Sequence, residues 1–380
     1  MSGSGGLIHS KPFFHMMKIY CTNCRRPYPE QGAPFRCPAC GGLFDTVLPA
    51  LDMGEVDPLQ PGLWRYRYAL GLPPDAPLVT LGEGSTPLIE SGAFGQTILF
   101  KCEYQNPTGS FKDRGSAVIA SFLKSRGVER AVEDSSGNAG ASFAAYAARA
   151  GIPARIFIPD SASGPKRAQI EAYGVELVRI MGPRSNATKA VLQSLEKDPD
   201  LVYASHAFLP VNLPGYATLA YELVEQLGRA PGAVVAPVGQ GGLLLGLGRG
   251  FERLLHARQI ERLPRLVGVQ ARACAPLWAL HTYGPAGLHW VTEEPTLAEG
   301  VRVSQPLRGD ALLDLLAAGH GLLLAVDEEE ILPGRDELAR RGFYVEPTSA
   351  IVWGALAQAA GSLPEPVAVI LTGSGLKSGW

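Results

Sequence analysis

Long apolar runs are missing from this sequence. It contains no stretch of about 18 or more apolar residues, the length that a membrane-spanning helix requires. Its N-terminal stretch also lacks the basic region and the continuous apolar region of a signal peptide. We therefore expect a cytoplasmic protein without a membrane partner.

An excess of charge of one sign is missing as well. The chain has 34 Lys and Arg against 36 Asp and Glu, so its formal net charge is −2. A chain so nearly neutral does not generate the field that attracts nucleic acid or a membrane surface. The expected partner is a small molecule.

The chain has 380 residues, of which 46% are hydrophobic. It is therefore long and apolar enough to form about two globular domains and a small appendage. From residue 97 onward, short apolar runs alternate with helical patterns, as in βαβ units around a parallel sheet. The expected strands are 97–103, 131–134, 154–159, 175–180, 233–238, 266–270, 322–326 and 367–372. The expected helices include 140–150, 165–173, 216–227, 243–256 and 327–341.

This many strands exceeds one compact sheet, so we expect two layered α/β domains with mostly parallel sheets and a cleft between them. Residues 1–17 begin with a Gly- and Ser-rich stretch and are expected to form a flexible leader. A cysteine-containing module is expected at 18–48, and a Pro- and Gly-rich connector with the start of the main region at 49–96. The two-lobed region would span 97–380.

Four of the six cysteines form two C-x-x-C pairs with twelve residues between them: Cys21, Cys24, Cys37 and Cys40. Two thiolate pairs at this spacing close a tetrahedral zinc site. Two disulfides are the alternative, but cytoplasmic thiols stay reduced, so we favour zinc. Four protein ligands leave no open coordination position, which predicts a structural ion.

Lys112 lies in the segment NPTGSFKDRG, residues 106–115, which runs from a predicted strand through a tight turn into an apolar helix. At a helix N-terminus the macrodipole disfavours the charged form of the amine. A Schiff-base lysine needs such an environment, because only the neutral amine attacks an aldehyde. A solvated surface charge is the commoner role for such a lysine, so its interpretation depends on the neighbouring loops.

Two glycine-rich loops each join a predicted strand to a predicted helix. In the first, SSGNAG at 135–140, the Asn138 amide can donate to a phenolate oxygen and the serines can contact a carboxylate. An ordinary turn with an N-cap serine is the alternative. The second loop, at 237–243, has the glycine density of an anion site at a helix N-terminus. It lacks the GK[ST] ending of a Walker A loop, and no GxGxxG is present, which disfavours a nucleotide.

The order of these motifs resembles the tryptophan-synthase-like family of pyridoxal phosphate enzymes, fold type II, over nearly all of residues 80–380. Four features are most similar to threonine synthases within that family. They are NPTGSFKDRG, GEGSTPL at 82–88, TGSGLK at 372–377 and the N-terminal zinc-ribbon-like segment.

The resemblance implies roles for individual residues. Lys112 would carry pyridoxal 5'-phosphate and shuttle protons, Asn138 would donate to the cofactor's 3'-oxygen, and Thr372 would face the pyridine nitrogen. A neutral hydroxyl at that nitrogen makes the ring a weaker electron sink, which favours elimination and replacement over transamination. The cofactor phosphate would be held by Gly239, Gln240, Gly241, Gly242 and Leu243. The substrate site would include Ser135, Ser136 and Ala139 at the carboxylate, with Arg114 and Lys166 as candidate anion ligands.

The reaction implied is the conversion of O-phospho-L-homoserine and water to L-threonine and phosphate, by a homodimer. Gln240 replaces the asparagine that is usual in these synthases, Ser374 replaces a frequent histidine, and residues 161–169 look more like serine/threonine dehydratases. A serine/threonine ammonia-lyase or another β-replacement enzyme is therefore the alternative. A regulatory pseudo-enzyme paralogue is the non-enzyme alternative, against which the intact Lys112, Asn138 and Thr372 argue.

Overall fold

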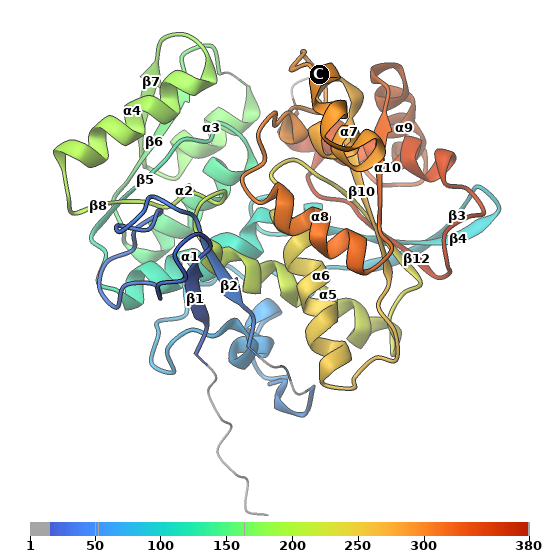
Figure 1. The fold of residues 1–380 in the computed structure, drawn as a ribbon, viewed down its shortest axis with the longest axis horizontal. Helices are drawn as coiled ribbons and strands as arrows, with labels where there is room; N and C mark the ends of the chain where they lie inside the picture. Colours follow the sequence, from blue (N-terminus) through green and yellow to red (C-terminus); the bar gives the residue numbers. More distant parts are fainter. Residues whose placement is uncertain (1–15, 50, 52, 163, 379–380) are drawn as a thin grey trace, which may run out of the picture.

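The computed structural model describes residues 16–49, 51, 53–162 and 164–378. The leader expected at 1–17 lies largely outside these residues. Three groups of strands organise the described chain: a 2-stranded hairpin, a 4-stranded sheet and a 6-stranded sheet. The two larger sheets form lobes that stand side by side, and the N-terminal hairpin lies in front of the smaller lobe (Figure 1).

The smaller lobe is built on a parallel sheet with the strand order β7-β6-β5-β8. Successive side chains of a strand point to opposite faces. Accordingly, Ala131 packs with α1, α2 and α3, whereas Val132 packs with α4 on the other face. The strands are β5 (Arg130–Glu133), β6 (Ala154–Pro159), β7 (Glu176–Ile180) and β8 (Leu201–Tyr203). The helices are α1 (Lys112–Ser125), α2 (Asn138–Ala150), α3 (Pro165–Ala172) and α4 (Arg184–Lys197).

The larger lobe is built on a sheet with the order β11-β10-β9-β12-β4-β3, parallel except for the β3–β4 hairpin. Its two central strands, β9 and β12, are apolar along their whole length, as expected where helices cover both faces. The strands are β3 (Leu88–Ala93), β4 (Gln96–Lys101), β9 (Ala233–Pro237), β10 (Arg265–Ala271), β11 (Leu322–Val326) and β12 (Val367–Ile370).

Helices cover both faces of this larger sheet. One face packs against α5 (Leu213–Leu227), α6 (Gly242–His256), α7 (Pro276–Tyr283) and α8 (Gly309–Ala318). The other face packs against α9 (Glu328–Arg340) and α10 (Pro347–Gln358). Short 3-10 segments are Met53–Glu55, Gly62–Leu70, Glu103–Gln105, Pro210–Asn212, Arg272–Cys274, Gly284–Trp290, Glu299–Val301 and Gly375–Lys377. None of the helices formed by the described residues is long and apolar enough to cross a membrane.

The cysteine module begins with β1 (Lys18–Cys21), which pairs antiparallel with β2 (Phe44–Val47). Its interior is continuous with the core of the smaller lobe, because Tyr28 and Phe44 belong to the same buried cluster as Phe122 of α1. The Tyr28 and Phe122 rings meet edge to face with centroids 6.1 Å apart. The module is thus packed onto α1, the helix that begins at Lys112.

The expected fold class is confirmed, and each of the expected strands forms with ends within two residues of those predicted. Two strands of the lobes were not expected. The edge strand β3 carries exposed and half-exposed residues along most of its length, and β8 has 3 residues. Neither offers the apolar run by which a strand is recognised.

Candidate active site

The lysine loop, residues 106–111, is paired with the C-terminal loop, residues 371–377. The backbone N–H of Phe111 donates to the carbonyl of Thr372 at 3.0 Å, and the N–H of Ser374 donates to the carbonyl of Gly109 at 2.9 Å. The two loops follow β4 and β12, which are parallel neighbours, so both leave the sheet at the same edge. Lys112 and Thr372 are therefore brought together at the carboxyl ends of the strands, where ligands bind in open α/β sheets.

Glu346 joins the two lobes at this edge. Its backbone N–H donates to the carbonyl of Gly373 at 3.0 Å, and its side chain is 2% exposed. The Asn138 amide donates to one carboxylate oxygen at 2.8 Å, and the Lys166 ammonium lies 2.9 Å from the other. The structure thus brings two predicted residues of the smaller lobe to the C-terminal loop of the larger one.

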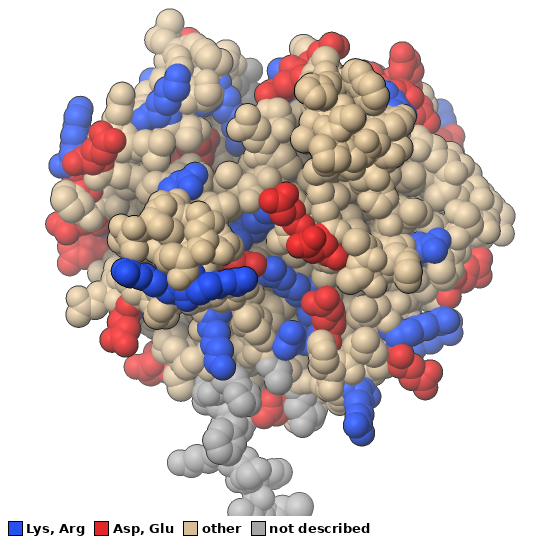
Figure 2. All heavy atoms as spheres, viewed as in Figure 1, with Lys and Arg blue, Asp and Glu red and all other residues tan. Residues whose placement is uncertain are grey.

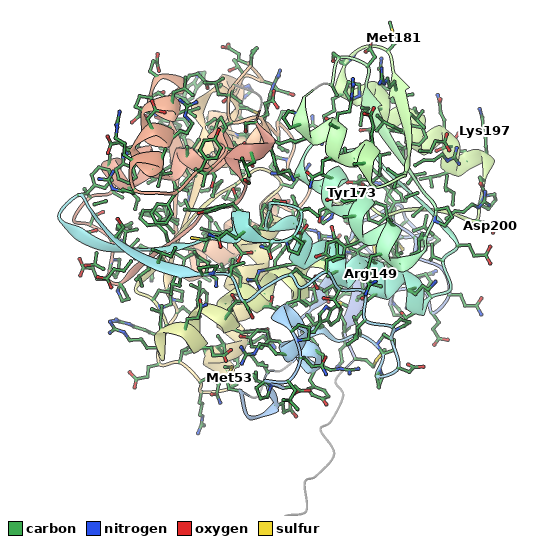
Figure 3. All side chains as sticks on the ribbon, turned by 180° about the vertical axis from the view of Figure 1, so that it is seen from behind. Met53, Arg149, Tyr173, Met181, Lys197 and Asp200 are labelled. Atoms are coloured by element: carbon green, nitrogen blue, oxygen red, sulfur yellow. The ribbon has the colours of Figure 1, made fainter. Side chains whose placement is uncertain are left out.

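Helix α3, which carries Lys166, is held against the lysine loop. The Gln169 amide donates to the carbonyl of Thr108 at 3.0 Å and to the hydroxyl of Tyr173 at 3.0 Å. Seen from behind, Tyr173 lies on the inner side of the smaller lobe, whereas Met181 lies at its outer end (Figure 3). The 2.9 Å contact of Lys166 with Glu346 shows that Lys166 faces the larger lobe.

The Lys112 amine has a lowered pKa. Its nitrogen lies 4.7 Å from the centroid of the Phe111 ring. Burial lowers the pKa of Lys112 to about 8, an effect that Glu133 and Glu346 oppose and Arg184 reinforces. A lysine with this pKa has a substantial neutral fraction at mildly alkaline pH, as a nucleophilic amine requires.

Several buried polar atoms around Lys112 have no hydrogen-bond partner among the described residues. They include the Thr372 hydroxyl, the Asn138 carbonyl oxygen, the Ser110 hydroxyl and one Glu133 oxygen. An unpaired buried polar atom costs roughly 1–3 kcal/mol, so such atoms are rare unless a ligand meets them. The free hydroxyl of Thr372 suits the pyridine nitrogen of pyridoxal phosphate. The side-chain nitrogen of Asn138, which could donate to the 3'-oxygen, donates to Glu346 here, and only the side-chain oxygen of Asn138 is unpaired.

The second glycine-rich loop, residues 237–243, joins β9 to α6 and is called the phosphate loop here after its predicted role. Gly241 has a φ of 85°, a conformation that favours glycine, and the next residue begins the helix. The Tyr216 side chain lies between this loop and α1, the helix that begins at Lys112. A Cβ atom added to Gly242 of the loop would lie 3.6 Å from the Tyr216 ring, and one added to Gly115 of α1 would lie 2.7 Å from the Tyr216 hydroxyl. One tyrosine thus separates Lys112's helix from a glycine-rich helix N-terminus, which could hold the phosphate of the same cofactor.

The asparagine loop, residues 135–140, places the predicted carboxylate ligands at the N-terminus of α2. Ser135 is buried and its hydroxyl accepts from the N–H of Gly137 at 3.2 Å. Ser136 and Ala139 are half-buried beside Asn138. Their contact with substrate stays a prediction.

Arg114 points away from this site. It is fully buried, and all three guanidinium nitrogens donate: to Glu103 at 2.7 and 2.8 Å, to Glu222 at 2.8 Å and to Thr218 at 3.1 Å. Its N–H groups are committed to carboxylates inside the larger lobe. Arg114 is therefore assigned a structural role and is removed from the expected substrate ligands.

Four charged residues at the site were not predicted. Lys377 is 7% exposed and donates to the carbonyl of Thr108 at 2.8 Å, and burial lowers its pKa to about 8. The others are Glu133, Arg184 and Glu346. Lys377 lies inside the TGSGLK motif, whereas a lone Glu before a proline gives no comparable signal. The face seen in Figure 2 is hollowed between the lobes, and charged side chains gather there.

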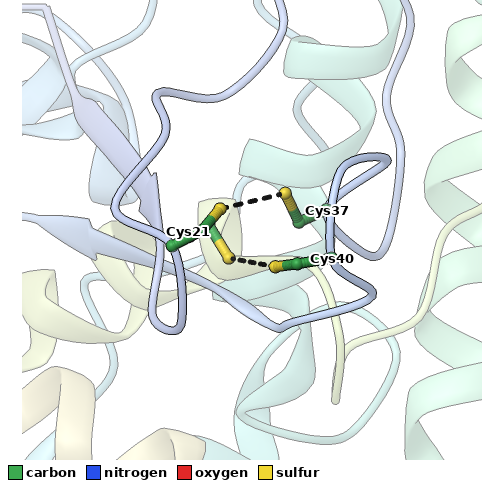
Figure 4. A group of neighbouring side chains, drawn as sticks. Cys21, Cys37 and Cys40 are labelled. Carbon is green, nitrogen blue, oxygen red and sulfur yellow. Dashed lines mark hydrogen bonds between the residues drawn. The ribbon is translucent and has the colours of Figure 1, made fainter.

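The four module cysteines form a cluster, with their sulphur atoms all within 4.8 Å of one another. The Cys21 and Cys40 sulphurs are 3.5 Å apart and those of Cys24 and Cys37 are 3.7 Å apart, with all four thiols free (Figure 4). Tetrahedral Zn–S bonds of about 2.3 Å imply sulphur separations of roughly 3.8 Å. The cluster therefore has the dimensions of a site that could hold zinc.

The comparisons with known proteins agree with this geometry. A family model described as pyridoxal-phosphate dependent enzyme matches residues 79–373, so the chain belongs to that family of enzymes. Within it, the chain is similar to threonine synthases. It is 31% identical to that of Methanocaldococcus jannaschii over 94% of this chain and 92% of the relative. It is 35% identical to that of Synechocystis sp. over 83% of this chain and 84% of the relative.

Solved structures support the fold. A threonine deaminase from T.th. superimposes with a TM-score of 0.64 and 27% identity, covering 78% of this chain and 94% of that one. This deaminase is similar in fold to the present chain, although its name describes a different reaction from that of the threonine synthases.

Proposed function

We propose that the protein converts O-phospho-L-homoserine and water to L-threonine and phosphate, with pyridoxal phosphate bound at Lys112. The cofactor, when bound, supplies the electron sink that lets protons leave the carbon atoms next to the amine. In the overall reaction the phosphate leaves Cγ and the hydroxyl group from water is added at Cβ. The names of the relatives, threonine synthases, support threonine as the product.

The observation that carries the proposal is the pair of ammonium groups around Glu346. Lys166 lies 2.9 Å from the Glu346 carboxylate, and the buried Lys377 is close enough for its pKa to respond to both. The Asp113 carboxylate also faces Lys377, so two carboxylates oppose these two ammonium groups. A substrate phosphate could compete with Glu346 for the ammonium of Lys166 by forming a charge-assisted contact.

Within this proposal the chain's own residues have separate tasks. Lys112 removes and returns protons, because its lowered pKa lets it act as base and acid at mildly alkaline pH. Asn138 and Thr372 orient the cofactor ring, and residues 239–243 hold its phosphate. Zinc on the four cysteines would have a structural role. A homodimer in the cytoplasm remains our expectation.

A serine/threonine ammonia-lyase is the second candidate, and the threonine deaminase fold neighbour favours it. One assay separates the two: O-phospho-L-homoserine, L-serine and L-threonine are offered separately, and phosphate, threonine and 2-oxo acid are measured. Release of phosphate with threonine supports the synthase. Production of 2-oxo acid from serine or threonine, with no reaction of phosphohomoserine, would replace it by the lyase.

A further inference from the structure

One carboxylate of the cysteine module, that of Asp45, forms ion pairs with the larger lobe. Asp45, in β2, is 6% exposed, and its two oxygens accept hydrogen bonds from the two terminal nitrogens of Arg249, both at 2.7 Å. Arg249 also donates to the carbonyl of Thr46 at 3.2 Å. A terminal nitrogen of Arg308 lies 3.5 Å from the same carboxylate. Asp45 therefore collects two arginines of the larger lobe.

Both arginines lead from Asp45 to the phosphate loop. Arg249 lies on α6, whose first residue, Gly242, belongs to the loop. Arg308 directly follows Leu307, whose N–H donates to the side-chain oxygen of Gln240 at 3.1 Å. Each route from the module thus ends on the segment that would hold the cofactor phosphate.

Arg308 and Asp45 are each held by further contacts. Arg308 is 7% exposed and donates to the carbonyl of Phe208 at 2.9 Å. In the module, the strand neighbour of Asp45 is Tyr20, and the adjacent pair joins Phe44 to Cys21 of the cysteine cluster. The cluster therefore fixes the hairpin that presents Asp45.

We propose that Asp45 is a positioning residue for cofactor binding, through which the cysteine module holds the phosphate loop in its binding geometry. The proposal rests on the proposed function, because it takes residues 239–243 as the cofactor phosphate site. It gives the module a task in the catalytic lobe beyond its own folding. Asp45 touches neither cofactor nor substrate; it acts through Arg249, Arg308 and the loop.

The test measures two affinities of the cofactor-free full-length protein, one for pyridoxal 5'-phosphate and one for pyridoxal, which lacks the phosphate. Asp45→Asn should weaken pyridoxal phosphate binding by about tenfold, the effect of losing about one charge-assisted hydrogen bond. Pyridoxal binding should stay within about twofold of wild type, a change well below one hydrogen bond. Arg249→Lys, which keeps the charge but loses the two-pronged contact, should act in the same direction.

The control is Arg126→Gln, which removes a different anchor of the module, the 2.8 Å bond from Arg126 to the carbonyl of Pro29. It should leave both affinities near wild type. Zinc content and thermal unfolding show whether each variant is folded. If Asp45→Asn does not fold, the two affinities of Arg249→Lys test whether the Asp45–Arg249 contact supports cofactor binding.

Three results would overturn the proposal. The first is an equal loss for both ligands, and the second is no loss for pyridoxal phosphate. The third is tighter binding of pyridoxal phosphate to Asp45→Asn, the sign that a merely electrostatic role predicts, because a negative charge near the loop has been removed. Failure of the wild-type protein to bind pyridoxal phosphate would instead overturn the proposed function, and this proposal with it.

Discussion

The side-chain amide of Asn138 donates a 2.8 Å hydrogen bond to the carboxylate of Glu346, a residue 208 positions further along the chain. The same amide is the proposed donor to the cofactor's 3'-oxygen. Binding of the cofactor there would replace Glu346 as the acceptor. The carboxylate would keep its contact with Lys166, so the lobes would remain joined while the cofactor occupies the space between them.

Replacement of Lys112 tests the cofactor assignment. After borohydride reduction, Lys112→Ala should carry no cofactor mass on the peptide that contains residue 112. Its turnover should fall at least about a thousandfold, since the change removes both the attachment point and the proton carrier. Lys124→Ala, an exposed lysine on the same helix, is the control and should behave as wild type. Cofactor mass on any other lysine after borohydride reduction would refute the assignment.

The pH dependence of cofactor uptake follows from the pKa of Lys112, which burial lowers to about 8. The neutral amine is the reacting form, and its fraction rises as pH rises through the pKa. The rate at which cofactor-free protein develops visible absorbance with pyridoxal phosphate should therefore increase by about tenfold per pH unit below 8 and level off above it. A rate that keeps rising to pH 10 would contradict the lowered pKa.

The sequence predicts the strands and loops better than the side chains that complete the site. The parallel strands were recognisable because their apolar runs are buried on both faces, as in β9. Lys112, Asn138 and Thr372 lie in glycine-rich loops whose residue order carries the family resemblance. The cysteine pairs were identified separately, by their spacing.

The positions of the other side chains at the site depend on contacts between residues far apart in the sequence. Whether Arg114 faces the substrate or the core is decided by Glu103 and Glu222, the latter 108 positions away. Glu346 reaches the site because β12 and the lysine loop place the C-terminal loop beside it, which no local pattern specifies. Asp45 likewise meets Arg249 from another lobe, 204 positions away.

Removal of the Arg114 guanidinium tests its structural role. Arg114→Met would leave Glu103 and Glu222 buried without this partner, which should lower the free energy of unfolding by about 3–5 kcal/mol. Arg130→Met, which breaks the exposed pair with Asp198, should cost about 1 kcal/mol or less. Urea unfolding of the two variants measures both values. Equal small losses would mean that the buried network is not needed for stability.

Metal analysis tests the cysteine cluster. Purified protein should contain about one zinc ion per chain, the number that one set of four thiolates binds. Cys37→Ser should lower zinc content and thermal stability, because an incomplete ligand set holds the ion weakly. Cys274 is a buried cysteine outside the cluster, so the Cys274→Ser variant should contain as much zinc as the wild-type protein. Disulfides between these four cysteines in freshly prepared protein would contradict the metal site.

Replacement of Lys166 tests the substrate. Lys166 approaches Glu346 at 2.9 Å on the inner side of α3, whereas its neighbour Arg167 pairs with Glu171 along the same helix. A substrate phosphate would form a charge-assisted contact with Lys166, a contact that the side chain of serine cannot make. Lys166→Ala should therefore reduce kcat/KM for O-phospho-L-homoserine about 10- to 100-fold, through KM, and change any reaction with L-serine far less.

Arg167→Ala is the matched control for Lys166→Ala, since it removes a cation from the next position of the same helix turn. It should leave the kinetics with O-phospho-L-homoserine within about threefold of wild type, because an exposed ion pair contributes little. If Lys166→Ala lowered kcat/KM equally for both substrates, Lys166 would act by positioning Glu346 and not by binding phosphate. The preference for a phosphorylated substrate would then have to come from Lys377, which faces Glu346 and Lys166, or from Arg184 of α4, which faces Lys112.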